Sequence, residues 1–422
     1  MKLGNLRHPI LTAQKAKSRL STHVNMLTFA YHGKRRFRGD PRYDLQNVTD
    51  GFRSRIDDQA EDAKILERIC NAYNKAVQRQ TSEPDFYPAS GRWQEIRQRS
   101  LRPVLRALLM RDIPGLGQMY RNFYRDACSS GILGAPGGLS GAYFSGKIRD
   151  VHRHFYLSHV LYRLDYWKAL TNGRYALRDL AGPGVGNPFG VIIDGTHISV
   201  GAEYSHYCSR RVSEQLDPEI ATVAEIGGGF GGIAYYLLRD RPGITYVDFD
   251  LPENIALASY YLMKAFPDRK FLCYGEGDIT RESITEANVV MLPRVALSRF
   301  PAGNVDLTFT SHGMSELSTG DVGHYLKEID RITDKRLLFM GNRAVSQGIS
   351  ESVQRGHAVF ALVDSREAGW HSYKVSGAGV GGAASTDAAT IVENSYIRNS
   401  HLKDLRASSD PPMAARLTLR NG

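Results

Sequence analysis

The sequence predicts an α/β protein in which a doubly wound, Rossmann-like sheet follows an N-terminal helical domain. Three observations support this fold class. Short apolar stretches alternate with helical stretches between residues 222 and 341. A glycine-rich run, residues 227–232, joins the first of these strands to the helix that follows it. Residues 56–175 instead show apolar side chains at helical spacing. Buried parallel strands joined by right-handed helical crossovers form such a sheet.

The 422 residues are enough for two domains. The glycine- and proline-rich residues 181–195 are typical of a connector between folded units. Much of the formal net charge of +10 lies near the N-terminus, which contains the run KRRFR. We therefore predict four parts: a basic N-terminal arm (1–55), a helical substrate, cap or oligomerisation domain (56–180), the α/β domain (181–370) and a partly flexible C-terminal extension (371–422).

Composition also limits the classes of partner. No apolar run reaches about 18 residues, so we expect no membrane-spanning helix. The N-terminus lacks the apolar core of a secretory signal, and we expect a cytoplasmic protein. The four cysteines show no zinc-like spacing and predict reduced thiols rather than a metal site. The basic arm is more typical of a solvated tail than of a nucleic-acid reader, because no RNA-binding or helix-turn-helix motif accompanies it.

Apolar periodicity predicts the individual elements. Acidic residues 57–62 precede the first helix, where the helix dipole favours them. The predicted helices of the N-terminal half lie around 65–77, 101–109, 119–127, 151–170 and 204–215. The predicted strands are 222–226, 244–249, 270–274, 289–292, 305–310 and 336–341. The helices predicted between them are 232–239, 253–266 and 321–332. One more strand or hairpin is expected near 390–397.

The glycine-rich run indicates a cofactor loop. Glycines let the backbone turn sharply and approach a ligand, and the N–H groups at a helix start can meet its polar atoms. Gly227, Gly228, Gly229 and Gly231 are the predicted loop residues, and the acid Glu225 precedes them by two positions. The spacing also satisfies a dinucleotide fingerprint, so a nicotinamide or flavin cofactor is the alternative. The acid at Glu225 and the short link to the next strand favour S-adenosylmethionine, with no metal required.

The second strand ends in two acids that face the glycine loop in the predicted sheet. Asp250, with Leu251 beside it, is the predicted contact to the ribose hydroxyls, and Asp248 is the second choice. Asp278 is one candidate for the adenine contact. The alternative is the apolar segment 291–297, against which adenine would stack.

The strand 305–310 should lie beside the first strand, so its end faces the transferred methyl group. A hydroxyl that is methylated must lose a proton, and His312 or Glu316 is the predicted base. Asn342 and Arg343 follow another strand and are predicted to bind the substrate. Tyr207, on the helix entering the sheet, is predicted to cover the methionine end of the cofactor, with core packing as the alternative.

Together these motifs resemble a family of bacterial sugar O-methyltransferases. The likeness covers about residues 60–345 and rests on the segments NAYNKA (71–76), GRWQEI (91–96), GNPFG (186–190), SHYCSRRV (205–212), AEIGGGFGGIAYYLL (224–238), DLPENIALASYYL (250–262), VVMLP (289–293), VDLTFTSHGMSELS (305–318) and GNR (341–343). The resemblance implies methyl transfer from S-adenosylmethionine to a sugar hydroxyl. Glu225 and the glycines fall on the family's cofactor loop, Asp250 on its ribose acid and Glu316 on its S-x-x-E-M element. This chain reads Ser-Glu-Leu there, and its N-terminus and tail find no counterpart.

Two rival readings stay open on the sequence alone. The acceptor could be a non-sugar natural product or RNA, as the basic arm suggests. The chain could also be a non-catalytic subunit that keeps the fold, although the intact glycine loop argues against this. A homo-oligomer is neither predicted nor excluded.

Overall fold

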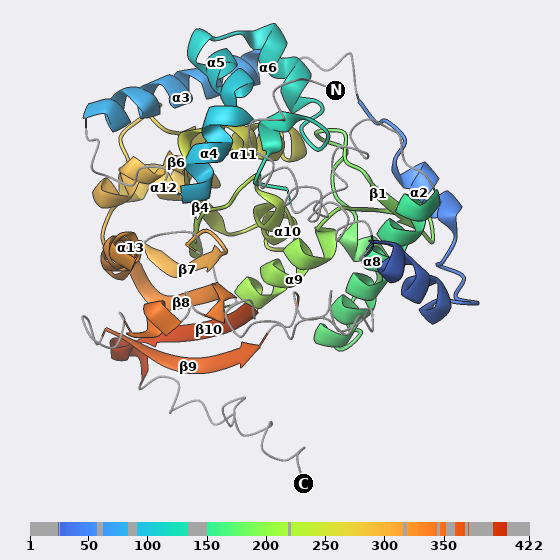
Figure 1. Cartoon of the computed structure of the whole chain (residues 1–422). Coiled ribbons are helices and arrows are strands. Elements are labelled where there is room, and N and C mark those ends of the chain that lie inside the picture. Colours follow the sequence, from blue (N-terminus) through green and yellow to red (C-terminus); the bar gives the residue numbers. More distant parts are fainter. Residues whose placement is uncertain are drawn as a thin grey trace, which may run out of the picture.

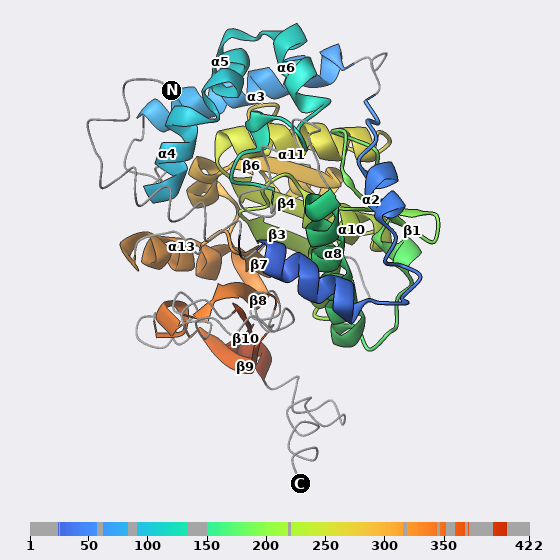
Figure 2. The same cartoon turned by 45° about the vertical axis from the view of Figure 1, so that its right-hand side comes forward.

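A computed structural model gives the fold of the chain. It describes residues 24, 26–56, 62–82, 91–133, 150–217, 221–314, 319–343, 347–351, 359–367, 370 and 391–402. Figure 1 shows a central sheet with helices packed on both faces. The helices between residues 63 and 120 gather in the upper part of Figures 1 and 2, whereas the helices at residues 45–51 and 150–170 lie apart from them. The predicted α/β class with a helical N-terminal part is confirmed.

The described part of the main sheet has eight strands in the order β5-β6-β4-β3-β7-β8-β10-β9. All pairings from β5 to β8 are parallel, whereas β10 is antiparallel to both β8 and β9. The order reverses between β3 and β7, which is where such sheets bind ligands. The strands are β3 (Thr222–Ile226), β4 (Thr245–Asp250), β5 (Phe271–Cys273), β6 (Val289–Pro293), β7 (Val305–Ser311), β8 (Thr333–Asn342), β9 (Phe360–Glu367) and β10 (Ile391–Arg398).

The crossover helices form where the sequence predicts them. The helix α11 begins at Pro252, a residue suited to the first helical position because its backbone N–H would be unpaired there. Nearly all of α11 is buried, since it lies between the sheet and α3. The helices of this part are α9 (Ala202–Ser213), α10 (Gly232–Asp240), α11 (Pro252–Ala265), α12 (Arg281–Glu286), the 3-10 helix η4 (Arg294–Arg299) and α13 (Thr319–Ile332). The short α12 was not predicted.

The N-terminal half is helical, as predicted. A helix over residues 26–36 is followed by α2 (Leu45–Gly51), α3 (Ala63–Ser82), α4 (Gly91–Arg99), α5 (Arg102–Met110), α6 (Ile113–Tyr120), η2 (Ala127–Ser129), α8 (Asp150–Leu170) and η3 (Leu177–Leu180). Asp62, just before α3, accepts hydrogen bonds from the Tyr260 hydroxyl at 2.9 Å and from Lys264 Nζ at 2.8 Å. These contacts fix α3 to α11 of the sheet layer.

The predicted connector at residues 181–195 is wrong in its second half. A two-stranded antiparallel hairpin forms there, with β1 (Gly190–Ile193) and β2 (Thr196–Ser199). Asp194 and Gly195 make its turn with φ values of 50° and 74°, and positive φ at both positions is typical of a tight hairpin turn. The buried side chains of Val191 and Ile198 attach the hairpin to the core.

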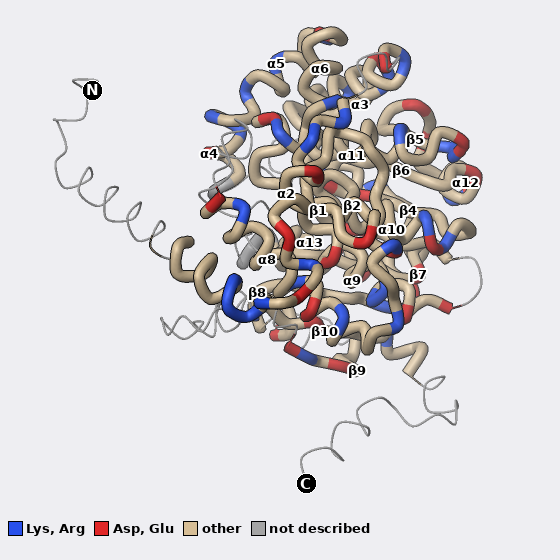
Figure 3. The backbone as a smooth tube through the Cα atoms, turned by 90° about the vertical axis from the view of Figure 1, so that its right-hand side faces the viewer, with Lys and Arg blue, Asp and Glu red and all other residues tan. Residues whose placement is uncertain are grey.

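The expected N-terminal arm also differs in its described part. Met26, Phe29, Phe37 and Val48 are buried in the main hydrophobic core. The ring of Phe37 lies 5.0 Å from that of Tyr162 on α8. These residues, from two helices and the turn between them, therefore pack on the chain's own core. The basic residues of the run at 34–38 stay exposed, and elsewhere Figure 3 shows acidic and basic residues interspersed.

One hydrophobic core joins the N-terminal helices, the hairpin and one face of the sheet, and a second core fills the opposite face around α13. The predicted boundary at residue 180 therefore does not separate two cores. The strand expected near 390–397 is confirmed as β10, whereas β9 was not predicted. Most of the predicted extension after residue 370 lies outside the described residues. None of the described helices is long and apolar enough to cross a membrane.

Candidate active site

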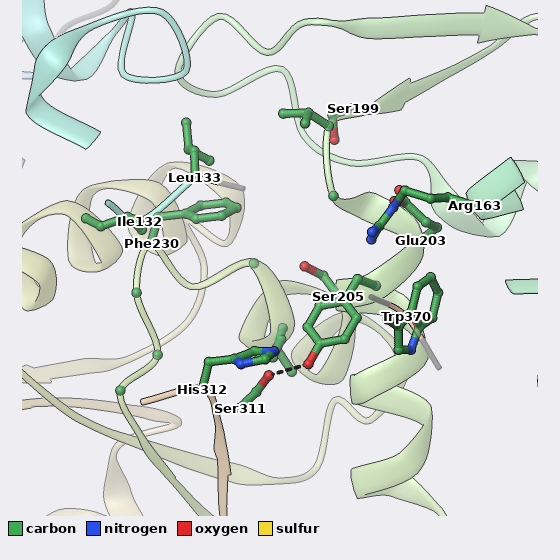
Figure 4. Close-up of a pocket in the computed structure, with 18 of the residues that line it drawn as sticks. Ile132, Leu133, Arg163, Ser199, Glu203, Ser205, Phe230, Ser311, His312 and Trp370 are labelled. Carbon is green, nitrogen blue, oxygen red and sulfur yellow. Dashed lines mark hydrogen bonds and ion pairs between the residues drawn. The ribbon is translucent and has the colours of Figure 1, made fainter. Parts of the chain in front are cut away.

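A cavity of about 570 Å³ opens at the carboxyl ends of β3 and β7, at the point where the strand order reverses. The glycine loop forms part of its wall, together with Glu225, Ser311 and His312. The start of α9, the middle of α8 and Trp370 complete the described wall. Figure 4 shows these side chains converging from segments far apart in the chain. The cavity thus lies where the sequence predicts a ligand site.

The glycine loop is held in a conformation that larger residues do not tolerate. Gly227 has a φ of 84°, and a Cβ atom there would stand 2.6 Å from the Cα of Gly313. A Cβ atom on Gly228 would stand 2.4 Å from a carboxylate oxygen of Asp248. No side chain caps the start of α10, which follows the loop at Gly232. The first N–H groups of that helix are therefore not taken by a capping side chain.

Glu225 brings a carboxyl group to the cavity wall at the end of β3. Its side chain is buried, and its Oε2 accepts a hydrogen bond of 2.5 Å from the Tyr246 hydroxyl. Burial raises the pKa of Glu225 to about 8, while the hydrogen bond from Tyr246 acts in the opposite direction. The carboxyl group is thus mostly protonated at neutral pH and ionises as the pH rises through about 8.

Asp248 and Asp250 support the loop from the neighbouring strand. Asp248 accepts the N–H of Gly228 at 3.2 Å, and burial with the nearby acidic charges raises its pKa. Its Oδ2 is buried and has no hydrogen-bond partner among the described residues. Asp250 accepts the N–H groups of Gly229 at 2.9 Å and Leu251 at 2.6 Å. Both acids therefore fix the loop backbone.

Asp250 does not line the cavity in this structure, and its side chain is buried. The guanidinium of Arg294 approaches its Oδ1 to 3.7 Å. Leu251 is also buried. Neither residue lines the described cavity. Both lie directly behind the glycine loop, which does line it.

The end of β7 carries the predicted base His312. Its backbone has a φ of 63°, which is uncommon outside glycine, and its N–H donates to the carbonyl of Met340 at 2.9 Å. The unusual conformation turns the chain directly after β7 while the side chain stays at the cavity. Beside it, the Tyr204 hydroxyl and Ser311 Oγ share a hydrogen bond of 2.8 Å. Strain of this kind is often found at functional sites.

Glu316, the other predicted base, lies outside the described residues. Four further predicted contacts, three residues and one segment, do not line the described cavity. Asp278 is exposed in the loop before α12, and the alternative adenine segment is buried around η4. Arg343 forms an ion pair with Glu367 of β9, and Asn342 pairs with Ile391 at the end of β8.

Tyr207 is also placed differently from the prediction. Its hydroxyl donates to Glu393 Oε1 at 2.7 Å, and the side chain is buried under β10. The alternative of core packing is therefore the one observed. The neighbouring His206 accepts a hydrogen bond from Trp167 Nε1 at 3.2 Å, and burial lowers its pKa to about 4. The residues of α9 that reach the cavity lie one turn earlier.

Several cavity residues were missed by the sequence analysis. They come from α8, α9, the hairpin and the segment after β9, and they are Arg163, Ser199, Glu203, Tyr204, Ser205 and Trp370. The one available signal was the charged and aromatic start of α9 next to the motif SHYCSRRV. The other residues reach the cavity only through tertiary packing.

Comparison with known proteins agrees with the position of the site. Residues 200–299 match the family model of the O-methyltransferase domain. Acetylserotonin O-methyltransferase of Gallus gallus is 29% identical over 89 residues, which are 21% of this chain and 25% of that protein. The chain thus spans about a quarter of the length of this curated relative. The matched segment of the family contains α9, the glycine loop and Asp250.

Two solved methyltransferase structures superpose on part of the chain. Geranyl diphosphate methyltransferase in complex with GPP and sinefungin is 12% identical, with a TM-score of 0.34 over 56% of this chain and 99% of that one. Magnesium protoporphyrin IX methyltransferase from Synechocystis PCC 6803 with bound S-adenosylmethionine is 10% identical, with a TM-score of 0.31 over 57% and 97%. The strand order, the glycine loop and the family match agree on one description. The strand order is that of a Rossmann-like fold, and residues 200–299, which include the glycine loop, match the family model of the O-methyltransferase domain.

Proposed function

We propose that the chain is an S-adenosylmethionine-dependent O-methyltransferase whose acceptor is a hydroxyl group of a sugar or glycosylated metabolite. The observation that carries this proposal is a single cavity that contains both the glycine loop and His312. The loop provides a place for the cofactor, and the histidine provides a base within the same space. Methyl transfer to a hydroxyl requires both.

The described residues fit this cofactor. S-adenosylmethionine, when bound, supplies a methyl group on an already electrophilic sulfonium. The carboxyl groups of Glu225 and Asp248 lie beside the loop, and Asp248 Oδ2 has no hydrogen-bond partner there. These buried carboxyl groups offer oxygen acceptors to a ligand with N–H or O–H donors, and a bound positive charge would favour their ionised forms. Gly228 lies so close to Asp248 that no side chain fits at this position. The loop therefore presents its backbone to the cavity here.

In the proposed mechanism the protein mainly positions the reactants and accepts a proton. His312, or Glu316 as the alternative, accepts the proton of the acceptor hydroxyl. Tyr204 and Ser311 hold each other at 2.8 Å beside His312 and restrict the orientation of the acceptor. The glycine loop would hold S-adenosylmethionine in the same cavity, where its methyl group would be supplied to the acceptor oxygen.

The sugar acceptor is supported by the resemblance of the motifs between residues 60 and 345 to sugar O-methyltransferases. The curated relative is named for an aromatic acceptor, acetylserotonin. An aromatic hydroxyl is therefore the second candidate acceptor. The four free, buried cysteines are typical of a reducing compartment and support a cytoplasmic location.

The ribose contact of Asp250 stays a proposal. Its carboxylate has about four lone-pair positions, and the hydrogen bonds to Gly229, Leu251 and Asn254 use three of them. A ribose hydroxyl can use a remaining position when the carboxylate becomes accessible from the cavity. The roles proposed for Asp278, Tyr207, Asn342 and Arg343 receive no support from their positions.

Calorimetric titration with S-adenosylmethionine and S-adenosylhomocysteine tests the proposed cofactor. We expect the wild-type protein to bind both, and Asp250→Ala to weaken binding by about tenfold or more, because it loosens the loop and removes the ribose acceptor. Asp268→Ala is the matched control, since Asp268 is exposed and far along the chain from the loop. Absence of binding by the wild-type protein would contradict the proposed function.

A further inference from the structure

The cavity has two unlike sides. Figure 4 shows Ile132 and Phe230 on the side of the glycine loop and Arg163, Glu203 and Trp370 on the side across from it. The apolar side belongs to the proposed cofactor loop. The other side is assembled from α8, α9 and residue 370, and the proposed mechanism gives Arg163, Glu203 and Trp370 no role.

Arg163 and Glu203 form an ion pair on this second side. Only 13% of the Arg163 side chain and 5% of the Glu203 side chain are exposed. A buried ion pair loses much of the hydration of both charges, so it contributes little to stability compared with apolar residues of similar size. Its position on a cavity wall therefore points to a role in binding.

Trp370 lies against the same pair. The guanidinium carbon of Arg163 is 4.9 Å from the centre of the indole ring, and Tyr204 and Tyr166 meet the indole edge to face at 5.3 and 5.0 Å. The ring is thereby fixed in place. Its Nε1 is buried and has no hydrogen-bond partner among the described residues. Leaving a buried donor unpaired is unfavourable, and a ligand oxygen would supply the missing acceptor.

We propose that Arg163, Glu203 and Trp370 bind the methyl acceptor, and that this acceptor is a neutral ring with two adjacent hydroxyl groups. This inference rests on the proposed methyltransferase function. The two oxygens of the Glu203 carboxylate can accept two neighbouring hydroxyl protons, while Arg163 and the indole N–H donate to ring or hydroxyl oxygens. The paired charges of Arg163 and Glu203 cancel, which favours a neutral acceptor over an ionic one.

Adjacent hydroxyl groups occur on sugar rings and on aromatic rings, and the test distinguishes these two classes of acceptor. The full-length protein, saturated with S-adenosylhomocysteine, is titrated with methyl mannopyranoside and with a deoxy analogue that lacks one of the adjacent hydroxyls. Catechol and phenol form the second pair. We expect one of the two diols to bind at least about tenfold more tightly than its mono-hydroxyl control. If neither diol binds more tightly than its control, the inference is wrong.

Two variants test whether Glu203 and Trp370 bind the acceptor. Glu203→Gln keeps the shape of the side chain and should weaken binding of the preferred diol by about tenfold. Trp370→Phe, which removes the N–H donor together with part of the indole ring, should weaken it by about threefold or more. Both should leave the affinity for S-adenosylhomocysteine within about twofold of the wild type, which also shows that they fold. Glu276→Gln, in an ion pair with Arg68 outside the cavity, is the control and should change neither affinity. Unchanged diol affinity in both variants would overturn the inference.

The two proposals fail in different ways. If the wild-type protein does not bind S-adenosylhomocysteine, the proposed function itself falls. If it binds S-adenosylhomocysteine but prefers neither diol, only the acceptor inference falls.

Discussion

Three carboxyl groups surround the glycine loop, and each lies in a different environment. They belong to Glu225, Asp248 and Asp250. Asp250 is bonded to the loop and faces Arg294. Glu225 instead meets the Tyr246 hydroxyl and the cavity. Because burial raises the pKa of Glu225 to about 8, this residue holds a proton that the unfolded chain has already released at neutral pH. Its titration therefore affects both folding and binding.

The effect on folding has a definite sign. Between the ordinary pKa of 4.5 and about 8, the folded protein binds one proton more than the unfolded chain at this group. The contribution of Glu225 to the free energy of unfolding therefore falls as the pH rises through this interval and is constant above it. Glu225→Gln has no such titration, so its stability relative to the wild type should increase with pH across the interval.

The same titration predicts a change in cofactor preference. Ionised Glu225 attracts the sulfonium of S-adenosylmethionine more than the neutral sulfur of S-adenosylhomocysteine. As the pH rises through about 8, the ratio of the two affinities should shift toward S-adenosylmethionine by up to about tenfold. Calorimetry at a series of pH values measures this ratio, and Glu225→Gln should show no shift. A flat ratio in the wild type would contradict the assigned titration.

At the scale of elements, the loops after β3 and β7 pack backbone to backbone. Gly227 and Gly313 meet so closely that a Cβ atom on Gly313 would stand 2.2 Å from the carbonyl oxygen of Ile226. The Thr310 hydroxyl also donates to that carbonyl at 2.9 Å. The cofactor loop and the loop of the predicted base are thus held in one fixed arrangement.

Gly227→Ala should disrupt this arrangement. The new Cβ atom would meet the Cα of Gly313, and alanine at a φ of 84° is strained. We expect a loss of about 1 to 3 kcal/mol in the free energy of unfolding, together with loss of S-adenosylhomocysteine binding. Gly243→Ala is the matched control, because a Cβ atom there meets nothing within 4 Å. Chemical denaturation and calorimetry measure the two effects, and wild-type binding by Gly227→Ala would contradict the role of the contact.

The elements that the sequence predicted well are those whose pattern is local. The strands β3, β4 and β7 are buried on both faces, so they read as apolar runs with ends near the observed ones. The strand β9 was missed because most of its side chains are partly or fully exposed. The hairpin was read as a connector because its glycine and proline residues outweighed the Asp194-Gly195 turn signal.

The same distinction applies to the site. Glu225, the glycines and His312 lie within continuous motifs, and the sequence led to them directly. Arg163, Glu203 and Trp370 come from three separate segments and meet only in the folded chain. On α9 the sequence indicated the correct helix but the wrong turn, since periodicity alone does not say which end of a helix meets a cavity.

At the scale of the whole molecule, the N-terminal helices and the sheet are parts of one packed unit. Phe37, Leu66 and Tyr162 belong to the same core as Leu237 and Phe309 of the sheet layer. The ion pair of Asp62 with Lys264 further joins α3 to α11. We therefore expect the described parts to unfold together.

Phe37→Ala tests this cooperativity. Removing a buried phenylalanine should lower the free energy of unfolding by about 3 to 5 kcal/mol. Scanning calorimetry should show one transition shifted to lower temperature, with calorimetric and van't Hoff enthalpies that agree. Tyr31→Ala is the control in the helix that directly precedes Phe37, since Tyr31 is 58% exposed and should change stability by less than about 0.5 kcal/mol. Two transitions, of which only one moves, would contradict a shared core.

The position of β10 between β8 and β9 has a consequence for biosynthesis. While the ribosome makes the chain from its N-terminus, β9 emerges before β10, although β10 is its partner in the finished sheet. Until residues 391–398 emerge, the outer edge of β8 exposes unpaired backbone groups, and such edges attract other chains. The newborn chain therefore cannot complete this sheet before residues 391–398 have emerged, and until then the edge of β8 is a place where another chain can pair.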